Sequence, residues 1–196
     1  MSLNDAVLLG VQRPQIVLLP VDVVSLDAAT EVIELADTYG ICRGLPLDES
    51  QRFTLTAALG ERVDGSWAAT TVADFEPRQN GKNDTLAARE LGGLVLLGEQ
   101  LLIHTAHELP TAMESFRRLV AVFEAWDDLR RKVARIRYGN GDQAIEMLNG
   151  ARLLYRARTG GSSRGFAEAD FVAYDEAQNV KPEHLSASAP AMLAAS

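Results

Sequence analysis

Cysteine is almost absent from this chain of 196 residues, since Cys42 is the only one. A single cysteine excludes an intramolecular disulfide and is typical of proteins of a reducing cytoplasm. The first residues lack the basic stretch and apolar core of a secretory signal. No apolar run approaches the length of about 20 residues that a membrane-spanning helix needs. We therefore expect neither a disulfide framework nor a membrane partner.

Ligand spacing for a histidine-based metal site is also absent, because the three histidines are scattered along the chain. Positive charge is scarce overall, and the net charge of −8 argues against a domain that coats nucleic acid. The charge is uneven, however. Residues 117–164 contain ten Arg and one Lys against five acids, so this segment carries +6 and the remainder −14. Ordinary surface ion pairs and an Arg-bearing face for a subunit, DNA or a phosphate both remain possible interpretations.

Helical and extended patterns alternate through the middle of the chain. Helices are predicted near residues 26–39, 49–59, 82–97 and 110–126, and strands near 68–75, 100–105 and 171–174. Asn149-Gly150 lies between two apolar segments, which is a strong hairpin signal. The order predicts an α/β fold with a mostly parallel central sheet, helices on both faces and an inserted β-hairpin.

Gly81 and Lys82 lie between an apolar run at residues 67–75 and a helical pattern. A strand, a tight loop with Gly-Lys and a helix form the context of a phosphate-binding loop. In such a loop, backbone N–H groups and the helix N-terminus point at phosphate oxygens. Lys82 would add a positive charge that reaches the β- and γ-phosphates.

Two positions depart from the usual loop pattern. Glu76 occupies the place of the first glycine, and Asn83 stands where Ser or Thr normally binds magnesium. An amide oxygen is still a possible Mg²⁺ ligand, and pairing with Arg78 would neutralise Glu76. The alternative interpretation is a solvated turn that caps a helix.

A second informative stretch is the apolar run 171–174, which ends in Asp175-Glu176. Buried parallel strands read as such runs, and ligand sites lie at their carboxyl ends. Asp175 would hold Mg²⁺, and Glu176 would polarise the attacking water of a phosphoryl transfer. The alternative is a helix N-terminus that carries acids. Together with the loop, this order predicts a P-loop nucleotide triphosphatase.

With both elements placed, the chain resembles the ATPase domain of the large terminase subunit of tailed bacteriophages, which has a RecA-like (ASCE) P-loop fold. The likeness rests on residues 47–51, 77–83, 105–107, 163–166 and 172–178. An Arg inside the phosphate loop and an Arg-Gly shortly before the Asp-Glu strand are less general than the nucleotide motifs. They favour this family over other P-loop enzymes.

The resemblance implies roles for individual residues. Gln51 would read the adenine edge, although Asp48 and Gln51 also fit a capping box at a helix start. Arg78 would sense the γ-phosphate, or else pair with Glu76. Arg164 would act as an arginine finger across a subunit interface, with Arg158 as a competitor. The loop that binds the phosphates would consist of Arg78, Gln79, Asn80, Gly81, Lys82 and Asn83, with ATP and Mg²⁺ as cofactors.

The resemblance further implies that residues 1–196 form an N-terminal ATPase fragment without the nuclease domain. Residues 1–60 would supply the adenine-side extension and residues 61–196 the P-loop core. Its partners would be double-stranded DNA, a homo-oligomeric ring on a capsid portal and the small terminase subunit, in the host cytoplasm. Two alternatives remain open: a helicase-like remodelling ATPase and a nucleotide-regulated assembly domain that does not catalyse.

Overall fold

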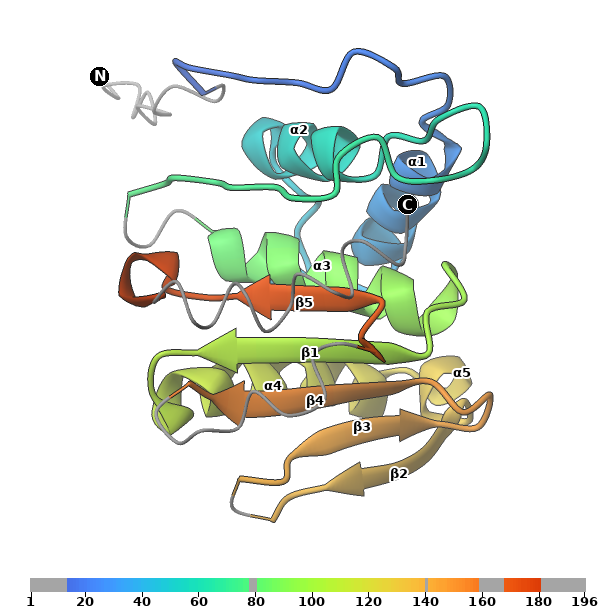
Figure 1. Cartoon of the computed structure of the whole chain (residues 1–196). Coiled ribbons are helices and arrows are strands. Elements are labelled where there is room, and N and C mark those ends of the chain that lie inside the picture. Colours follow the sequence, from blue (N-terminus) through green and yellow to red (C-terminus); the bar gives the residue numbers. More distant parts are fainter. Residues whose placement is uncertain (1–13, 78–80, 140, 159–167, 181–196) are drawn as a thin grey trace, which may run out of the picture.

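The computed structural model describes residues 14–77, 81–139, 141–158 and 168–180. The helices are α1 (Asp27–Thr38), α2 (Glu49–Ala58), α3 (Lys82–Val95), α4 (Leu109–Ala125) and α5 (Asp127–Arg130), with a short 3₁₀ helix η2 (Ala177–Asn179). The strands are β1 (Leu101–Ala106), β2 (Val133–Arg137), β3 (Ala144–Met147), β4 (Arg152–Ala157) and β5 (Phe171–Tyr174). The prediction of an α/β fold is confirmed (Figure 1). No helix of these ranges is both long and apolar enough to span a membrane.

One five-stranded sheet forms the centre of the molecule, in the order β2-β3-β4-β1-β5. Strand β1 pairs in parallel with both β4 and β5, whereas β3 pairs antiparallel with β2 and β4. The predicted hairpin is β3–β4, and its turn contains Asn149 and Gly150. Gly150 has a φ of 92°, and the Asn149 side chain accepts a hydrogen bond of 3.0 Å from the N–H of Ala151. Asn-Gly therefore provides the left-handed backbone that the turn requires.

Helices α3 and α4 pack on the same face of the sheet. His104 of β1 and Tyr155 of β4 are register partners, so their side chains lie on one face. Glu90 of α3 bonds to both, and the ring of Phe116 on α4 lies 5.3 Å from that of Tyr155. Figure 1 shows α1 and α2 beyond α3, away from the sheet. Among the described residues, the helices that contact the sheet lie on one face. The expectation of helices on both faces is therefore not confirmed.

The predicted strand at residues 68–75 is wrong. Residues 71–77 are extended but belong to no strand of the sheet, and the nearest pairing is an isolated bridge between Glu61 and Trp67. Phe75 is 92% exposed. The run of Thr, Val and Ala favours an extended backbone, but propensity alone cannot form a strand without a hydrogen-bonding neighbour.

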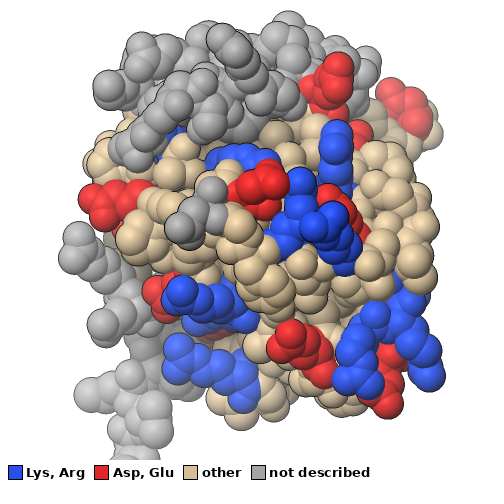
Figure 2. All heavy atoms as spheres, turned by 90° about the horizontal axis from the view of Figure 1, so that it is seen from below, with Lys and Arg blue, Asp and Glu red and all other residues tan. Residues whose placement is uncertain are grey.

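Four arginines of the basic segment form ion pairs within the chain. Arg118 pairs with Asp84, Arg130 with Asp127, Arg156 with Asp142, and Arg137 with both Asp142 and Glu146. Figure 2 shows Lys and Arg interspersed with Asp and Glu on the lower face. For these arginines, ordinary ion pairing is the interpretation that the structure supports.

Candidate functional site

The carboxyl ends of β1, β4 and β5 lie at the same end of the molecule as the N-terminus of α3, on the left in Figure 1. Lys82 is the first residue of α3, and Asp175 follows β5 directly. The Lys82 Nζ atom lies 3.9 Å from Asp175 Oδ1. The structure therefore brings together the two residues that the separate sequence motifs singled out.

The N-terminus of α3 lacks a side-chain cap. Gly81 is the N-cap residue, with a φ of 86°. Its carbonyl accepts the N–H of Asp84 at 2.8 Å and so begins the helix. In the first turn, Asn83 Oδ1 and Thr85 Oγ1 are buried and have no hydrogen-bond partner within the described part of the chain. A buried polar oxygen without a partner is costly, so this turn is suited to a ligand that would satisfy it.

Asp175, the partner of Lys82, is buried and held by backbone hydrogen bonds. It is 3% exposed, and its N–H donates to the carbonyl of Thr105 at 2.8 Å, which extends the pairing of β5 with β1. Its Oδ1 accepts the N–H of Glu176 at 2.8 Å. Glu176 adopts a left-handed conformation, with φ 54° and ψ 53°. This conformation costs a residue with a Cβ on the order of 1–2 kcal/mol, which marks the Asp-Glu turn as a specified geometry.

Arg158 joins the ends of β1 and β5, a role that sequence reasoning missed. Its guanidinium donates to the carbonyls of Thr105, Asp175 and Glu176 at 2.9, 2.7 and 3.0 Å. Burial lowers the pKa of this guanidinium, and the nearby carboxylates of Asp175 and Glu176 oppose that effect. Arg158 was a competitor for the arginine finger, but its two terminal nitrogens donate inside the chain and the residue is 8% exposed. These contacts support an internal role for Arg158, and the choice of arginine finger stays a prediction.

Gln51 forms the capping box that was the alternative to adenine recognition. The Gln51 N–H donates to Asp48 Oδ1 at 2.8 Å, and Gln51 Oε1 accepts from the Asp48 N–H at 2.9 Å. In addition, Gln51 Nε2 donates to the Gly81 carbonyl at 3.1 Å. Gln51 thus connects the start of α2 to the start of α3.

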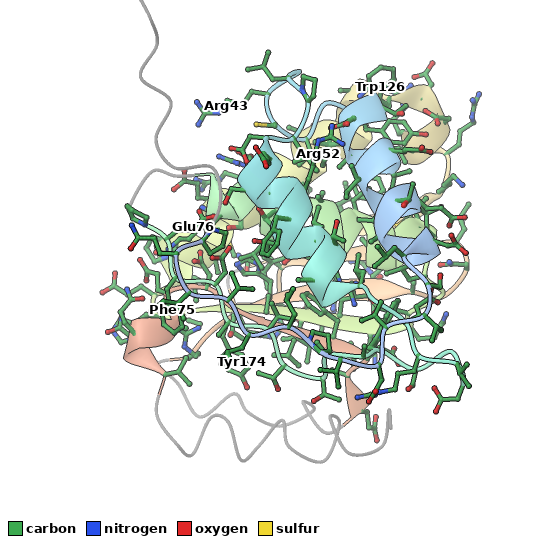
Figure 3. All side chains as sticks on the ribbon, turned by 90° about the horizontal axis from the view of Figure 1, so that it is seen from above. Arg43, Arg52, Phe75, Glu76, Trp126 and Tyr174 are labelled. Carbon is green, nitrogen blue, oxygen red and sulfur yellow. The ribbon has the colours of Figure 1, made fainter. Side chains whose placement is uncertain are left out.

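Glu76 is close to α2, because Ser50 Oγ donates to Glu76 Oε1 at 3.3 Å. Figure 3 shows Phe75 and Glu76 on the same side of the molecule as η2, which follows the Asp-Glu turn. Four of the predicted site residues, Arg78, Gln79, Asn80 and Arg164, lie outside the described residues. Their predicted roles, and the pairing of Arg78 with Glu76, stay predictions.

Asp84 supports the candidate loop from below. Its carboxylate pairs with Arg118 of α4 and accepts a 3.7 Å hydrogen bond from the Cys42 thiol. Burial and the negative charge of Asp84 raise the pKa of Cys42. An acid at this position of a helix is favourable by itself. Its partner Arg118 comes from another helix, and no local sequence signal connects the two residues.

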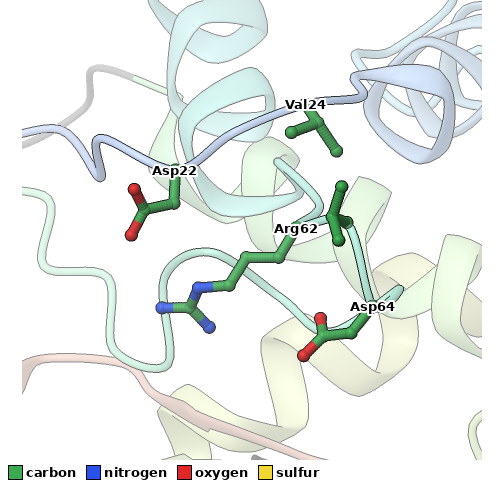
Figure 4. A pocket seen from close by; sticks show the side chains of 5 residues that line it. Asp22, Val24, Arg62 and Asp64 are labelled. Carbon is green, nitrogen blue, oxygen red and sulfur yellow. The ribbon is translucent and has the colours of Figure 1, made fainter.

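A shallow hollow elsewhere on the surface is lined by Asp22, Val24, Arg62, Val63 and Asp64 (Figure 4). The Arg62 guanidinium donates to the carbonyls of Trp67 and Ala68 at 2.7 and 3.0 Å. Arg62 therefore holds the neighbouring loop through its two terminal nitrogens. The hollow contains none of the predicted site residues.

Metal binding would have to rely on few protein ligands. Within the described ranges, no three His, Cys, Asp or Glu residues gather in a way that could hold a metal ion. Mg²⁺ differs from zinc in that it keeps several waters and is often held by one or two side chains together with phosphate oxygens. Asp175 and Asn83 carry oxygen ligands of the kind that Mg²⁺ prefers.

Comparison with solved structures identified the crystal structure of the HK97 bacteriophage large terminase. The TM-score is 0.70 at 19% identity, and the match covers 85% of this chain and 35% of that chain. At this identity the likeness shows a shared fold, and it agrees with the family that the sequence motifs resemble. This chain thus corresponds to 35% of the length of the terminase. No protein-family model matches the chain, and no curated protein matches it.

Proposed function

We propose that this chain is the ATP-hydrolysing motor domain of a phage DNA-packaging terminase. The observation that carries the proposal is the meeting of Lys82, at the N-terminus of α3, with Asp175, at the end of β5. A cation and a helix N-terminus on one side, with a buried carboxylate on the other, suit a phosphate chain that binds together with Mg²⁺. The fold shared with a large terminase supports the same reading.

Each residue has a distinct task in this proposal. Lys82 and the loop that includes Arg78, Gln79, Asn80 and Gly81 bind the phosphates. Asp175 and Asn83 would hold Mg²⁺, which neutralises charge on the phosphate oxygens when it is bound. The unpartnered Asn83 Oδ1 fits a ligand role.

Hydrolysis would depend on Glu176 and Arg164. The left-handed turn at Glu176 separates its backbone from the strand, and its carboxylate would polarise the attacking water. Arg164 would stabilise the transferred phosphoryl group from a neighbouring subunit. Arg158, by contrast, would keep β1 and β5 in register beneath the site.

The wider biology belongs to the proposal as well. A homo-oligomeric ring on a capsid portal would couple ATP hydrolysis to movement of double-stranded DNA, in company with the small terminase subunit and in the host cytoplasm. A helicase-like ATPase would use the same nucleotide residues, so the binding site alone does not separate the two. The departures at Glu76 and Asn83 favour the non-catalytic assembly domain as the other candidate.

Calorimetric titration of the chain with Mg-ATP tests the nucleotide site. Lys82→Ala removes the cation that contacts phosphate, and hydrogen bonds of charged groups contribute about 1.5–3 kcal/mol. We therefore expect affinity to fall by about 10- to 100-fold. Lys132→Ala is the matched control, because it removes a lysine at the end of α5, distant in the chain from the loop. Equal affinities for the parent and Lys82→Ala would contradict the proposed phosphate site.

Glu176→Gln separates binding from hydrolysis. The amide preserves the size of the side chain but no longer accepts a proton, and general-base groups contribute typically about 10²- to 10⁴-fold to rates. We expect Mg-ATP affinity close to that of the parent and turnover slower by at least about 100-fold, measured as phosphate release. Unchanged turnover would remove Glu176 from the mechanism, and a parent that binds Mg-ATP without turnover would favour the assembly domain.

A further inference from the structure

We infer that Gln51 positions the start of α3, which presents Lys82 to the proposed phosphate site. Its side-chain amide ties the carbonyl of Gly81, at the start of α3, to the start of α2. The inference rests on the proposed function for the class of ligand, a nucleoside triphosphate. The hydrogen bond between Gln51 and Gly81 is present in the folded chain without any nucleotide.

The amide of Gln51 is buried, and both its oxygen and its nitrogen have partners within the chain. Its oxygen accepts the Asp48 N–H at 2.9 Å, and its nitrogen donates to the Gly81 carbonyl at 3.1 Å. The Gln51 amide also hydrogen-bonds the Cys42 thiol, which lowers the pKa of Cys42 against the larger opposing effect of burial. The residue is 1% exposed. An adenine edge would need both a donor and an acceptor from the amide. The oxygen keeps a second lone pair, but the nitrogen already donates to Gly81 and Cys42, so base recognition would require one of these contacts to break.

Gly81 permits this contact because it has no Cβ atom. Its φ of 86° is in the region that favours glycine, and a Cβ atom there would lie 2.6 Å from Gln51 Nε2. The same Gly81 carbonyl accepts the N–H of Asp84, the bond that begins α3. Gln51 and the first turn of α3 therefore share one acceptor, and loss of the Gln51 bond would loosen the place where α3 begins.

Lys82 depends on that starting point. It is the first residue of α3, so its backbone follows Gly81 directly, and its Nζ atom faces Asp175 at 3.9 Å. A shift at Gly81 would move Lys82 and the N–H groups of the first turn relative to β5. Such a shift would weaken contacts with the phosphates. Because every nucleoside triphosphate has the same phosphates, the affinity for each of them should fall alike.

Gln51→Glu isolates the contact with Gly81. Glutamate is an ordinary capping-box partner, so Oε1 still accepts the Asp48 N–H. However, the Nε2 donor that bonds to the Gly81 carbonyl is replaced by a carboxylate oxygen. Two oxygens then face each other, and the hydrogen bond to Gly81 is lost. Asp48→Ala is the matched control, because it removes the acceptor of the Gln51 N–H and leaves the Gln51–Gly81 bond in place. Both variants are measured at pH 8, where a carboxylate is ionised.

Calorimetry with Mg-ATP, Mg-GTP and inorganic tripolyphosphate separates positioning from base recognition. We expect Gln51→Glu to weaken all three by the same factor, roughly 10-fold for a lost and reversed hydrogen bond. Asp48→Ala should lower the melting temperature but keep the three affinities within about twofold, because only a helix cap is lost. A Gln51→Glu variant that loses ATP affinity while GTP and tripolyphosphate affinities stay unchanged would overturn the inference, as would three unchanged affinities.

Amide hydrogen exchange tests the hydrogen bond between Gln51 and Gly81 without any nucleotide. In Gln51→Glu, the amides of residues 82–85 should exchange faster than in the parent and in Asp48→Ala. Unchanged exchange in Gln51→Glu would overturn the positioning role. If the parent binds no nucleotide, the proposed function fails, and the exchange result still decides whether Gln51 holds the loop.

Discussion

Gly81 shows how strictly a single residue of the candidate loop is specified. Two independent constraints apply to it: a left-handed backbone, and the close approach of Gln51 Nε2. Gly65 shares only the first constraint, because its φ is 80° and a Cβ there would meet nothing within 4 Å. The two glycines therefore form a natural pair for separating backbone strain from crowding.

Alanine substitution at each glycine gives the comparison. Gly65→Ala should reduce the free energy of unfolding by about 1–2 kcal/mol, the cost of the left-handed region for a residue with a Cβ. Gly81→Ala should lose more than this and should also lose Mg-ATP affinity, because its Cβ displaces Gln51. Urea unfolding and calorimetry measure the two effects. Equal destabilisation with intact binding would mean that the Gln51 contact contributes nothing.

Arg158 and Lys82 illustrate what the sequence could and could not reveal about single residues. Lys82 follows a glycine and precedes a helix, which is a local pattern. The partners of Arg158 are the carbonyls of Thr105, Asp175 and Glu176, far apart in the chain. A basic side chain in a loop carries no sign of such partners, so its internal role became visible only in the structure.

At the scale of elements, prediction succeeded where the signal was local. Helix α4 was expected at residues 110–126 and lies at Leu109–Ala125, and the Asn-Gly turn joins β3 and β4 as expected. The strand expected at 68–75 failed because a strand depends on a neighbour that composition cannot supply. The rule that ligand sites lie at the carboxyl ends of parallel strands accounts for Asp175 after β5. Lys82 meets Asp175 although the strand expected before the loop is missing from the sheet.

Helix α3 is held on the sheet by buried polar groups as well as by apolar packing. Arg89 pairs with Glu99, and Glu90 accepts from His104 Nδ1 at 2.6 Å and from the Tyr155 hydroxyl at 3.2 Å. Such groups are stabilising only while their partners remain. These buried polar contacts fix the position of α3 against β1 and β4. They therefore also fix the position of Lys82, the first residue of α3.

Stability should depend on pH through His104. Burial by itself lowers the pKa of His104, but the charge of Glu90 and the hydrogen bond to it raise the pKa, with a smaller raising effect from Asp175 and a lowering effect from Arg158. The net direction is upward from the ordinary value of about 6.5. A raised folded-state pKa contributes stability that is complete below the unfolded pKa and is lost as pH rises through the folded pKa.

Urea unfolding of the parent, His104→Gln and Glu90→Gln between pH 6 and pH 9 tests this direction. The parent should lose its advantage over His104→Gln as the pH increases. Glu90→Gln should show the smaller pH dependence, because the carboxylate that raises the pKa is gone. Tyr155 does not interfere, since burial, followed by Glu90, raises its pKa well above the ordinary value. A parent whose advantage grows with pH would contradict the assignment.

At the scale of the whole molecule, the distribution of charge limits how the proposed motor domain could contact DNA. The net charge is −8, and several arginines of the basic segment pair with acids. Within the described ranges, six cations of this segment form no ion pair. Arg158 donates to carbonyls inside the chain, which leaves five free cations: Arg117, Arg131, Lys132, Arg135 and Arg152. Arg135 and Arg152 both lie opposite Glu146 across the strands, on the sheet face away from α3 and α4. A motor that moves along DNA would be served by such few and weak contacts.

The affinity of the chain for double-stranded DNA should therefore be weak and modestly dependent on salt. Each phosphate contact contributes about 0.9 to the slope of log affinity against log salt, so five free cations set a limit of about 4–5. The double variant Arg135→Gln with Arg152→Gln should reduce the slope by about 2. The matched double variant Arg130→Gln with Arg137→Gln removes cations that are already paired and should change the slope less. Fluorescence anisotropy between about 50 and 200 mM salt measures both slopes. A parent slope near −10, or equal effects of the two double variants, would show that the paired arginines also reach DNA.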